Sequence, residues 1–292
     1  MTNEGISTVR CRQIRDEDIA AIVELLTHGF PRTTREHWSR GLKRLSERES
    51  VAPYPKYGYL LEGGAGLIGV ILLIFSVRQG EEGSYTICNL SSWYVDPEYR
   101  GYASLLIAAA VRHKTVTYVN VSPALHTWRT IEAQGFRRYS DGMFVSLPAL
   151  GGAAPRVSVE TFDPRRDYKN ILSAAEYELI AAHVDYGCVA LIAMEAGLGH
   201  PFVFVRRQRL RGFVPNHQLC YCRDVADFPR FSGPLGRALI MRGVFLVLVD
   251  ARAPLRGLPG LYFADCRPNY FKGPHEPAIG DLAFTEAVLF GL

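Results

Sequence analysis

The residues best suited to chemistry lie where an apolar strand passes through a short turn into a helix, within residues 89–106. The turn contains Arg100 and Gly101, and the small residues Ala103 and Ser104 follow it. A helix N-terminus offers unpaired backbone N–H groups and a positive dipole end, which suit a pyrophosphate. Arg100 adds positive charge, and small side chains let a ligand approach the backbone. The segment indicates a phosphate site; the alternative is an ordinary turn that caps a core helix.

This turn resembles the acyl-CoA-binding motif of the GNAT superfamily of acyltransferases. The residues that match the family pattern are Val95, Pro97, Arg100 and Gly101. Ala103 replaces the usual glycine of the motif, and Leu105 stands where glycine or alanine is expected. The resemblance implies acetyl-CoA or another short acyl-CoA as co-substrate. The residues that it places at the coenzyme are Trp93, Tyr94, Val95, Arg100, Gly101, Tyr102, Ala103 and Ser104.

A second segment, residues 121–136, resembles the GNAT region in which the fifth strand leads into a helix that ends in a Gly-Phe pair, here Gly135 and Phe136. The two segments together imply an α/β fold of the α+β type, with one mixed sheet and two central parallel strands that splay apart. The pantetheine arm of the coenzyme would enter the splay, between the strand of residues 93–95 and the strand that contains Asn120 and Ser122.

The resemblance implies transfer of an acetyl or short acyl group to an amine by direct attack on the thioester. In the family a tyrosine often protonates the leaving thiolate, but Ile131 occupies that position, and Ala124 replaces a frequent asparagine. Another group must then supply the proton. The first candidates are Ser122 and Tyr139, followed by Tyr94 and His126. No metal is expected in this chemistry.

Small residues and proline interrupt all periodicity at residues 150–155, which predicts a boundary between a coenzyme-binding domain, 1–150, and a second α/β domain, 151–292. Strands are expected at 9–14, 57–61, 67–75, 85–95 and 115–121, helices at 16–30, 34–45, 101–113 and 124–134, and a turn at 141–142 within the stretch 136–147. In the second half, helices are expected at 174–186 and 235–242, and strands at 189–195, 202–207, 219–223, 244–250 and 282–290.

The second half is interpreted either as a degenerate tandem GNAT copy or as an unrelated α/β module. Its passage from strand to helix lacks the Arg-Gly turn and carries Asp224 and Asp227 near the place that phosphates would occupy. Carboxylates there would repel a pyrophosphate. The sequence therefore predicts a second domain without a coenzyme site of its own.

Composition bounds the remaining possibilities. Of the 292 residues, 48% are hydrophobic and 21% charged, and the net charge is +4, which predicts two folded domains and no nucleic-acid partner. Arg206, Arg207, Arg209 and Arg211 are interpreted as a solvated strand face. The longest apolar run, residues 67–75, is too short to span a bilayer, and no signal peptide is recognised, so no membrane partner and a cytoplasmic location are expected.

Three hypotheses remain open. The first is an N-acyltransferase acting on a small-molecule or peptide amine. The second, motivated by Ile131 and Ala124, is a protein that binds acyl-CoA without turnover. The third is a structural scaffold that has lost the coenzyme, motivated by Leu105 and the acidic turn of the second half. The acceptor and the oligomeric state are not encoded in a recognisable motif.

Overall fold

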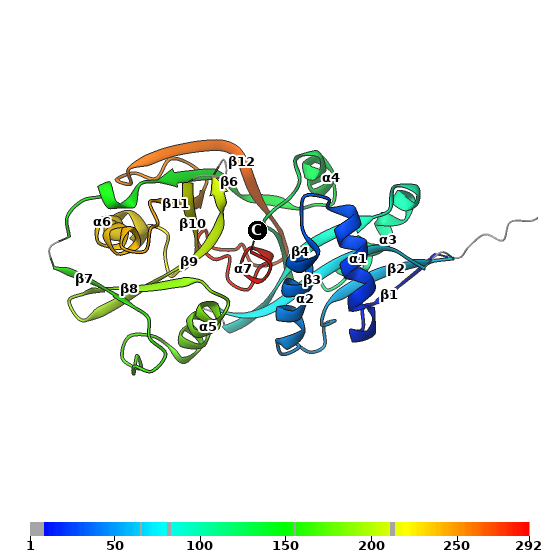
Figure 1. Ribbon diagram of the computed structural model, residues 1–292, viewed down its shortest axis with the longest axis horizontal. Helices are drawn as coiled ribbons and strands as arrows, with labels where there is room; N and C mark the ends of the chain where they lie inside the picture. Colours follow the sequence, from blue (N-terminus) through cyan, green and yellow to red (C-terminus); the bar gives the residue numbers. More distant parts are fainter. Residues whose placement is uncertain (1–8, 65, 81–82, 155, 211–213, 292) are drawn as a thin grey trace, which may run out of the picture. The chain divides into compact units, whose positions relative to one another are not determined.

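The computed structural model describes residues 9–64, 66–80, 83–154, 156–210 and 214–291 (Figure 1). Side chains of residues 208–210 and 214 are outside this description, as is Arg211 of the predicted arginine face. The chain divides into two compact units, each with its own strands and helices. Unit 1 comprises residues 1–120 and 273–275, and unit 2 comprises 121–272 and 276–292.

Unit 1 is built on a five-stranded sheet in the order β1-β2-β3-β4-β5. Neighbouring strands are antiparallel except β4 and β5, which are parallel. The strand bounds are β1 Arg10–Gln13, β2 Gly58–Gly63, β3 Gly66–Gly80, β4 Gly83–Val95 and β5 Thr117–Asn120. Nine successive residues of β3, from Ile68 to Ser76, are buried, as expected for a strand covered on both faces.

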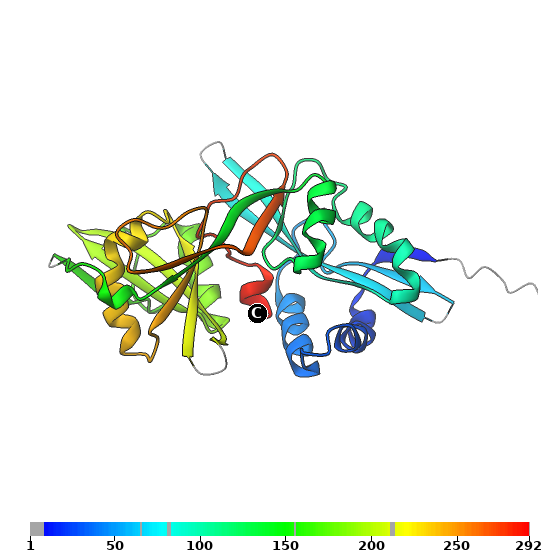
Figure 2. The ribbon, with the colours of Figure 1, turned by 90° about the horizontal axis from the view of Figure 1, so that it is seen from above.

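Three α-helices cover this sheet: α1 Ile19–Gly29, α2 Arg35–Glu47 and α3 Ala103–Ala110. Helices α1 and α2 lie on one face and α3 on the other (Figure 2). Thr34 caps α2, because its side chain accepts a hydrogen bond from the His37 amide. The expected helices near 16–30 and 34–45 are confirmed, whereas the helix expected at 101–113 begins only at Ala103 and ends at Ala110.

Unit 2 contains a seven-stranded sheet in the order β12-β6-β11-β10-β9-β8-β7. Strands β10 and β11 are parallel, and the other neighbours are antiparallel. The strand bounds are β6 Arg137–Ser146, β7 Val157–Thr161, β8 Val189–Glu195, β9 Leu198–Leu210, β10 Val214–Cys222, β11 Leu246–Ala251 and β12 Gly260–Lys272. The helices are α4 Trp128–Ala133, α5 Ala174–Asp185, α6 Asp227–Ile240 and α7 Glu286–Leu289.

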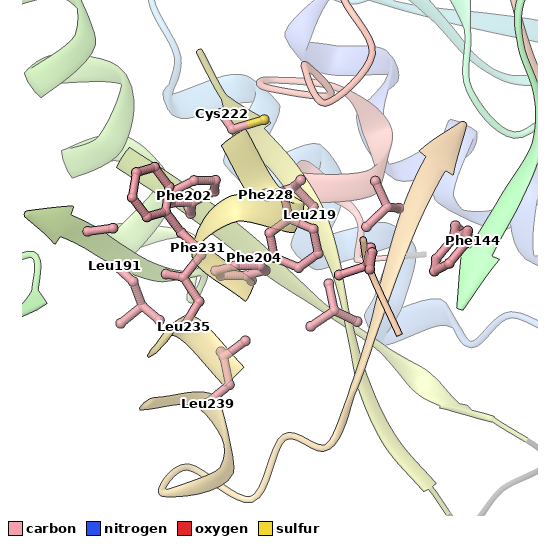
Figure 3. Packing of buried hydrophobic residues seen from close by; sticks show 14 of the residues in the cluster. Phe144, Leu191, Phe202, Phe204, Leu219, Cys222, Phe228, Phe231, Leu235 and Leu239 are labelled. Carbon is pink, nitrogen blue, oxygen red and sulfur yellow. The ribbon is translucent and has the colours of Figure 1, made fainter. Parts of the chain in front are cut away.

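Helix α6 forms the centre of the core of unit 2 (Figure 3). Its side chains Phe228, Phe231, Leu235 and Leu239 recur at helical spacing, and each is fully buried. They pack against apolar residues of the sheet, such as Phe202, Phe204 and Leu219. The sequence predicted a helix here only from residue 235, because Pro229, Gly233 and Pro234 weaken the helical pattern.

Several expectations are corrected in unit 2. The stretch 136–147 is a continuous strand without a turn at residues 141–142, because its second half is paired on both edges, with β11 and with β12. Strands β7 and β12 were not predicted. The terminal strand expected at 282–290 is wrong, since residues 286–289 form the short helix α7.

The observed units do not divide at residue 150. Residues 121–150, assigned to the first domain from the sequence, belong to unit 2, where β6 is hydrogen-bonded between β11 and β12. Within the stretch of linker-like composition, residues 151–154 form a loop inside unit 2, which is not the boundary of a compact unit. Within the described residues, none of the helices has the length and apolar character needed to cross a membrane.

Candidate functional site

The strands β4 and β5 of unit 1 separate, as the resemblance implied. Their parallel ladder joins only residues 87–89 of β4 to residues 117–119 of β5. Asn89 closes the ladder, because its side-chain amide donates to the carbonyl oxygens of Val119 and Leu90, both at 3.2 Å. Strand β4 continues to Val95 along β3. Residues 90–95 therefore have an edge that the ladder with β5 does not use.

A β-bulge lies in the part of β4 beyond the ladder. Ser91 pairs with Leu72 and Tyr94 with Val70, so two residues of β4 oppose one residue of β3. Ser92 has a φ of 49°, which is uncommon for a residue with a side chain. Its hydroxyl lies 3.0 Å from that of Ser91. Such a bulge changes the direction of backbone N–H and C=O groups and is frequent beside ligand sites.

The three β4 residues predicted at the coenzyme have different surroundings. Val95 is buried and faces Gly69, whereas Trp93 is half-buried. The ring of Tyr94 packs against the end of α1, so closely that a Cβ on Gly29 would lie 2.5 Å from it. Burial and the hydrogen bond with Asp96 raise the pKa of the Tyr94 hydroxyl. Tyr94 is therefore protonated at neutral pH and fixed in place.

The segment after β4 is a short 3₁₀-helix, Pro97–Tyr102, that leads directly into α3. The Asp96 amide donates to the Ile68 carbonyl at 2.9 Å, which anchors the turn to β3. Arg100, Gly101, Tyr102 and Ser104 are exposed, and Ala103 is half-buried. Tyr102, the N-cap residue of α3, makes no side-chain capping hydrogen bond. The first amide of α3 is not unpaired, because the Ala103 N–H donates to the Arg100 carbonyl of the 3₁₀-helix.

Gly101 is the residue of this turn whose type is not explained by the structure of the turn itself. A Cβ on Gly101 would meet no atom within 4 Å, and its φ is not in the left-handed region. Neither packing nor backbone conformation requires glycine there. The absence of a side chain instead leaves the backbone open to close approach by a ligand, so the residues fit the pyrophosphate that the motif predicts.

A groove of about 670 Å³ lies between α1 and the same turn. Its polar lining comes from Glu24, His28, Asp96 and Glu98. Three carboxylates make this groove unsuitable for a phosphate, because like charges repel. If the turn binds a pyrophosphate, it does so on the side formed by residues 100–104 and not in this groove.

The two candidate acids lie in unit 2, whereas the eight predicted coenzyme residues lie in unit 1. Ser122 is exposed, and its hydroxyl donates to the Glu286 carboxylate. Tyr139 is only 2% exposed, and its ring contacts Phe271 edge-on at 6.1 Å. Ile131 is buried in the position where the family often has tyrosine.

Unit 2 has the same arrangement of strands as unit 1, but the edge of its strand β10 past the parallel ladder is covered. The parallel ladder of β10 and β11 also covers only three residue pairs, 216–218 with 246–248, and β10 also has a register shift beyond it, between Leu219 and Tyr221. The edge of β10 past the ladder is occupied by residues 280–282. The Leu282 amide donates to the Cys220 carbonyl at 2.7 Å, and the Cys222 amide donates to the Gly280 carbonyl at 3.1 Å.

The turn after β10 is closed by its own side chains. The Arg223 guanidinium donates to both carboxylate oxygens of Glu176, at 2.6 and 2.8 Å. Asp224 accepts from the Ala226 amide at 2.8 Å, and Asp227 lies 3.0 Å from the His200 ring nitrogen. Sequence reasoning identified the acidic turn but missed the bulge at Ser92, the role of Asn89 and the strand-like segment 280–282, because none of these has a sequence signature.

No protein-family model matches the chain, and no curated protein sequence does. Among solved structures, the chain is similar to GCN5-related N-acetyltransferases from Anabaena variabilis and Kribbella flavida, with TM-scores of 0.60 and 0.59 at 11% and 14% identity. These matches cover 91% and 92% of this chain and 72% of each of the other chains. A protein from Pyrococcus horikoshii matches with a TM-score of 0.59 and 14% identity, over 97% of this chain and 96% of its own.

At these identities the comparisons show the fold. The chain has the α/β fold of GCN5-related N-acetyltransferases, with a mixed sheet, over about nine-tenths of its length. The resemblance recognised from residues 89–106 and 121–136 is thereby confirmed at the level of the fold.

Proposed function

We propose that the chain is an N-acyltransferase that moves an acetyl or short acyl group from coenzyme A to an amine, with its coenzyme site in unit 1. The observation that carries the proposal is the combination of separated β4 and β5 strands with an open turn at Gly101, in a fold shared with GCN5-related N-acetyltransferases. Unit 2 has the same strand arrangement but no free edge at this place.

The coenzyme would be held by the backbone of the turn and by its charge. The positive dipole end of the helical segment and the Arg100 guanidinium bind the pyrophosphate, since both present positive charge to an anion. The edge of β4 past Asn89 hydrogen-bonds the pantetheine arm through backbone groups of residues 90–95. The bound coenzyme supplies the thioester that the amine attacks.

The transfer needs hydrogen-bond donors at the thioester oxygen and a proton for the departing sulfur. When the amine nitrogen bonds to the carbonyl carbon, the C–S bond breaks, and the amine loses the proton that the thiolate needs. Backbone N–H groups at the Ser92 bulge are the donors that we assign to the oxygen.

The test is release of free thiol from acetyl-CoA in the presence of a panel of small and peptide amines. We expect release that depends on the amine and that falls in Arg100→Glu. Thiol release that no amine accelerates, with coenzyme binding intact, would instead support the second hypothesis, in which the chain binds acyl-CoA without turnover. That alternative is favoured by one observation, the buried Ile131 at the family's tyrosine position.

A further inference from the structure

Arg207 contradicts the expectation that the arginines of residues 206–211 form a solvated face. Strand β9 places Arg206 and Arg207 on opposite faces of the sheet, and only Arg206 is exposed. Arg207 is 7% exposed and lies opposite Asn216 of β10. The structure therefore keeps the charged end of Arg207 inside unit 2, where a guanidinium needs acceptors.

The guanidinium of Arg207 lacks sufficient acceptors within the described part of the chain. Its Nε and Nη1 atoms are buried and have no hydrogen-bond partner there. Asp250 and Glu286 attract it and the exposed Arg267 repels it, but burial dominates and lowers the pKa of Arg207 to about 10. A buried cation whose N–H groups are left open is costly, and the usual remedy is an anion that accepts from them.

Asp250 does not accept a hydrogen bond from the Nε or Nη1 atom of Arg207, and its partners are amide side chains. Its Oδ1 accepts from the Gln218 amide nitrogen at 3.0 Å, and its Oδ2 accepts from the Asn269 amide nitrogen at 2.9 Å. A carboxylate has further lone pairs, so Asp250 can still accept from a ligand. Burial raises the pKa of Asp250 to about 6, which leaves it mainly ionised at neutral pH.

Gln218 has a hydrogen-bond acceptor without a donor, on the same face of the sheet as the unpaired N–H groups of Arg207. The Oε1 atom of Gln218 is buried and has no donor among the described residues. Gln218 is two residues along β10 from Asn216, the residue opposite Arg207, so Arg207 and Gln218 are diagonal neighbours on one face. Diagonal neighbours in an antiparallel pair are about 7–8 Å apart. One small molecule that carries an anion and a donor can reach both.

We propose that Arg207, Gln218 and Asp250 form a binding site in unit 2 for a small α-amino acid. The ligand's carboxylate accepts from the Arg207 guanidinium, whose planar fork matches it. The ligand's ammonium donates to Gln218 Oε1 and to the Asp250 carboxylate. The site does not depend on coenzyme binding.

The first test uses the full chain without coenzyme. Thermal unfolding is measured with neutral α-amino acids, acetate, methylammonium and inorganic phosphate at equal concentration and ionic strength. We expect at least one amino acid to raise the midpoint saturably and more than acetate, methylammonium or phosphate does. A response to acetate or phosphate as large as that to every amino acid, or no response at all, overturns the proposal.

The second test measures affinity for the best amino acid by calorimetry in three variants. Arg207→Lys keeps the charge but loses the fork, and we expect it to weaken binding by at least about tenfold. Gln218→Met is expected to reduce the amino-acid response to that of acetate. Arg206→Met, the matched control on the exposed face, is expected to bind like the unaltered chain. Unchanged affinity in Arg207→Lys, with the circular dichroism spectrum intact, contradicts the site.

Discussion

The turn after β4 and the turn after β10 start from the same arrangement and end in opposite roles. In both units a strand leaves a three-residue parallel ladder, shifts register and turns into a helix. In unit 1 the helix begins beside the exposed Arg100 and Gly101. In unit 2 the strand edge is hydrogen-bonded to residues 280–282, and the first turns of the helix are buried in the core. The same strand arrangement is therefore followed by an exposed turn in unit 1 and by core packing in unit 2.

Side chains decide between the two roles. Helix α3 exposes Ser104 and Leu105 near its start, so these side chains are not needed for packing. Helix α6 has fully buried phenylalanines at its first turn and near its middle, and carboxylates at its start. A helix start that is needed for packing is not free to bind an anion.

The largest effect on the free energy of unfolding should come from a core residue of helix α6. Phe228→Ala removes a fully buried ring from the core of unit 2 and should lower the free energy of unfolding by about 3–5 kcal/mol. Leu105→Ala, on the exposed side of α3, should change it by less than about 0.5 kcal/mol. Chemical denaturation measures both. Equal losses of stability in the two variants would mean that α3 is as much a core helix as α6. The proposed difference between the turns that precede these helices would then be wrong.

The second prediction concerns the pH dependence of stability, which should differ between the parallel ladders of the two units. His217 is the middle residue of the β10 ladder, and burial lowers its pKa to about 4. The unfolded chain, with a histidine pKa near 6.5, binds the proton first, so stability is present above pH 6.5 and is lost as the pH falls to 4. The loss from this group is about 3 kcal/mol. Cys88, at the same place in the β4 ladder, has its pKa raised and does not ionise there.

Denaturation at several pH values, compared between the unaltered chain and His217→Gln, measures this contribution. The comparison is needed because Asp250 acts in the opposite direction, its raised pKa favouring the folded state as the pH falls through 6. The difference between the two chains should shrink as the pH falls from 6.5 to 4. A difference that stays constant with pH would contradict a buried neutral His217.

Gly280 should be a structural glycine. Its φ is +91°, and a Cβ would lie 2.8 Å from the Cys222 sulfur. We expect Gly280→Ala to lower the free energy of unfolding by about 1–3 kcal/mol, because a side chain is strained in this conformation. Affinity for acetyl-CoA should not change, since Gly280 lies in unit 2 and the proposed coenzyme site is in unit 1. Weaker coenzyme binding in this variant at a temperature where it is folded would contradict the assignment of the site to unit 1.

Gly101→Ala is the corresponding glycine substitution in unit 1, and we expect it to have the smallest effect on the free energy of unfolding. A Cβ at residue 101 meets open space, so the free energy of unfolding should stay within about 0.5 kcal/mol. Affinity for acetyl-CoA should fall by about tenfold or less, because the methyl group keeps the phosphate from the backbone. Calorimetric titration measures the affinity, and unchanged binding would show that close approach at this residue is not used.

The sequence predicted the fold of the first half well because its signals are local. The apolar run of β3, the helical spacing of apolar residues in α1 and the Arg100-Gly101 turn all act within a few residues. The sequence could not predict that β6 pairs inside unit 2, because strand pairing over a hundred residues leaves no local trace. The same holds for residues 280–282, whose hydrogen bonds with β10 join segments about sixty residues apart. It also holds for Arg207, whose burial depends on which face of β9 meets solvent.

The most direct test of the account is calorimetric titration of acetyl-CoA into the chain and into Arg100→Glu and Lys114→Glu. Lys114 is an exposed lysine past the other end of α3 and is a matched charge reversal. The account predicts one coenzyme bound per chain, with binding lost in Arg100→Glu and kept in Lys114→Glu. Two coenzymes per chain, or binding that survives in Arg100→Glu, would contradict the claim that only the turn of unit 1 is a coenzyme site.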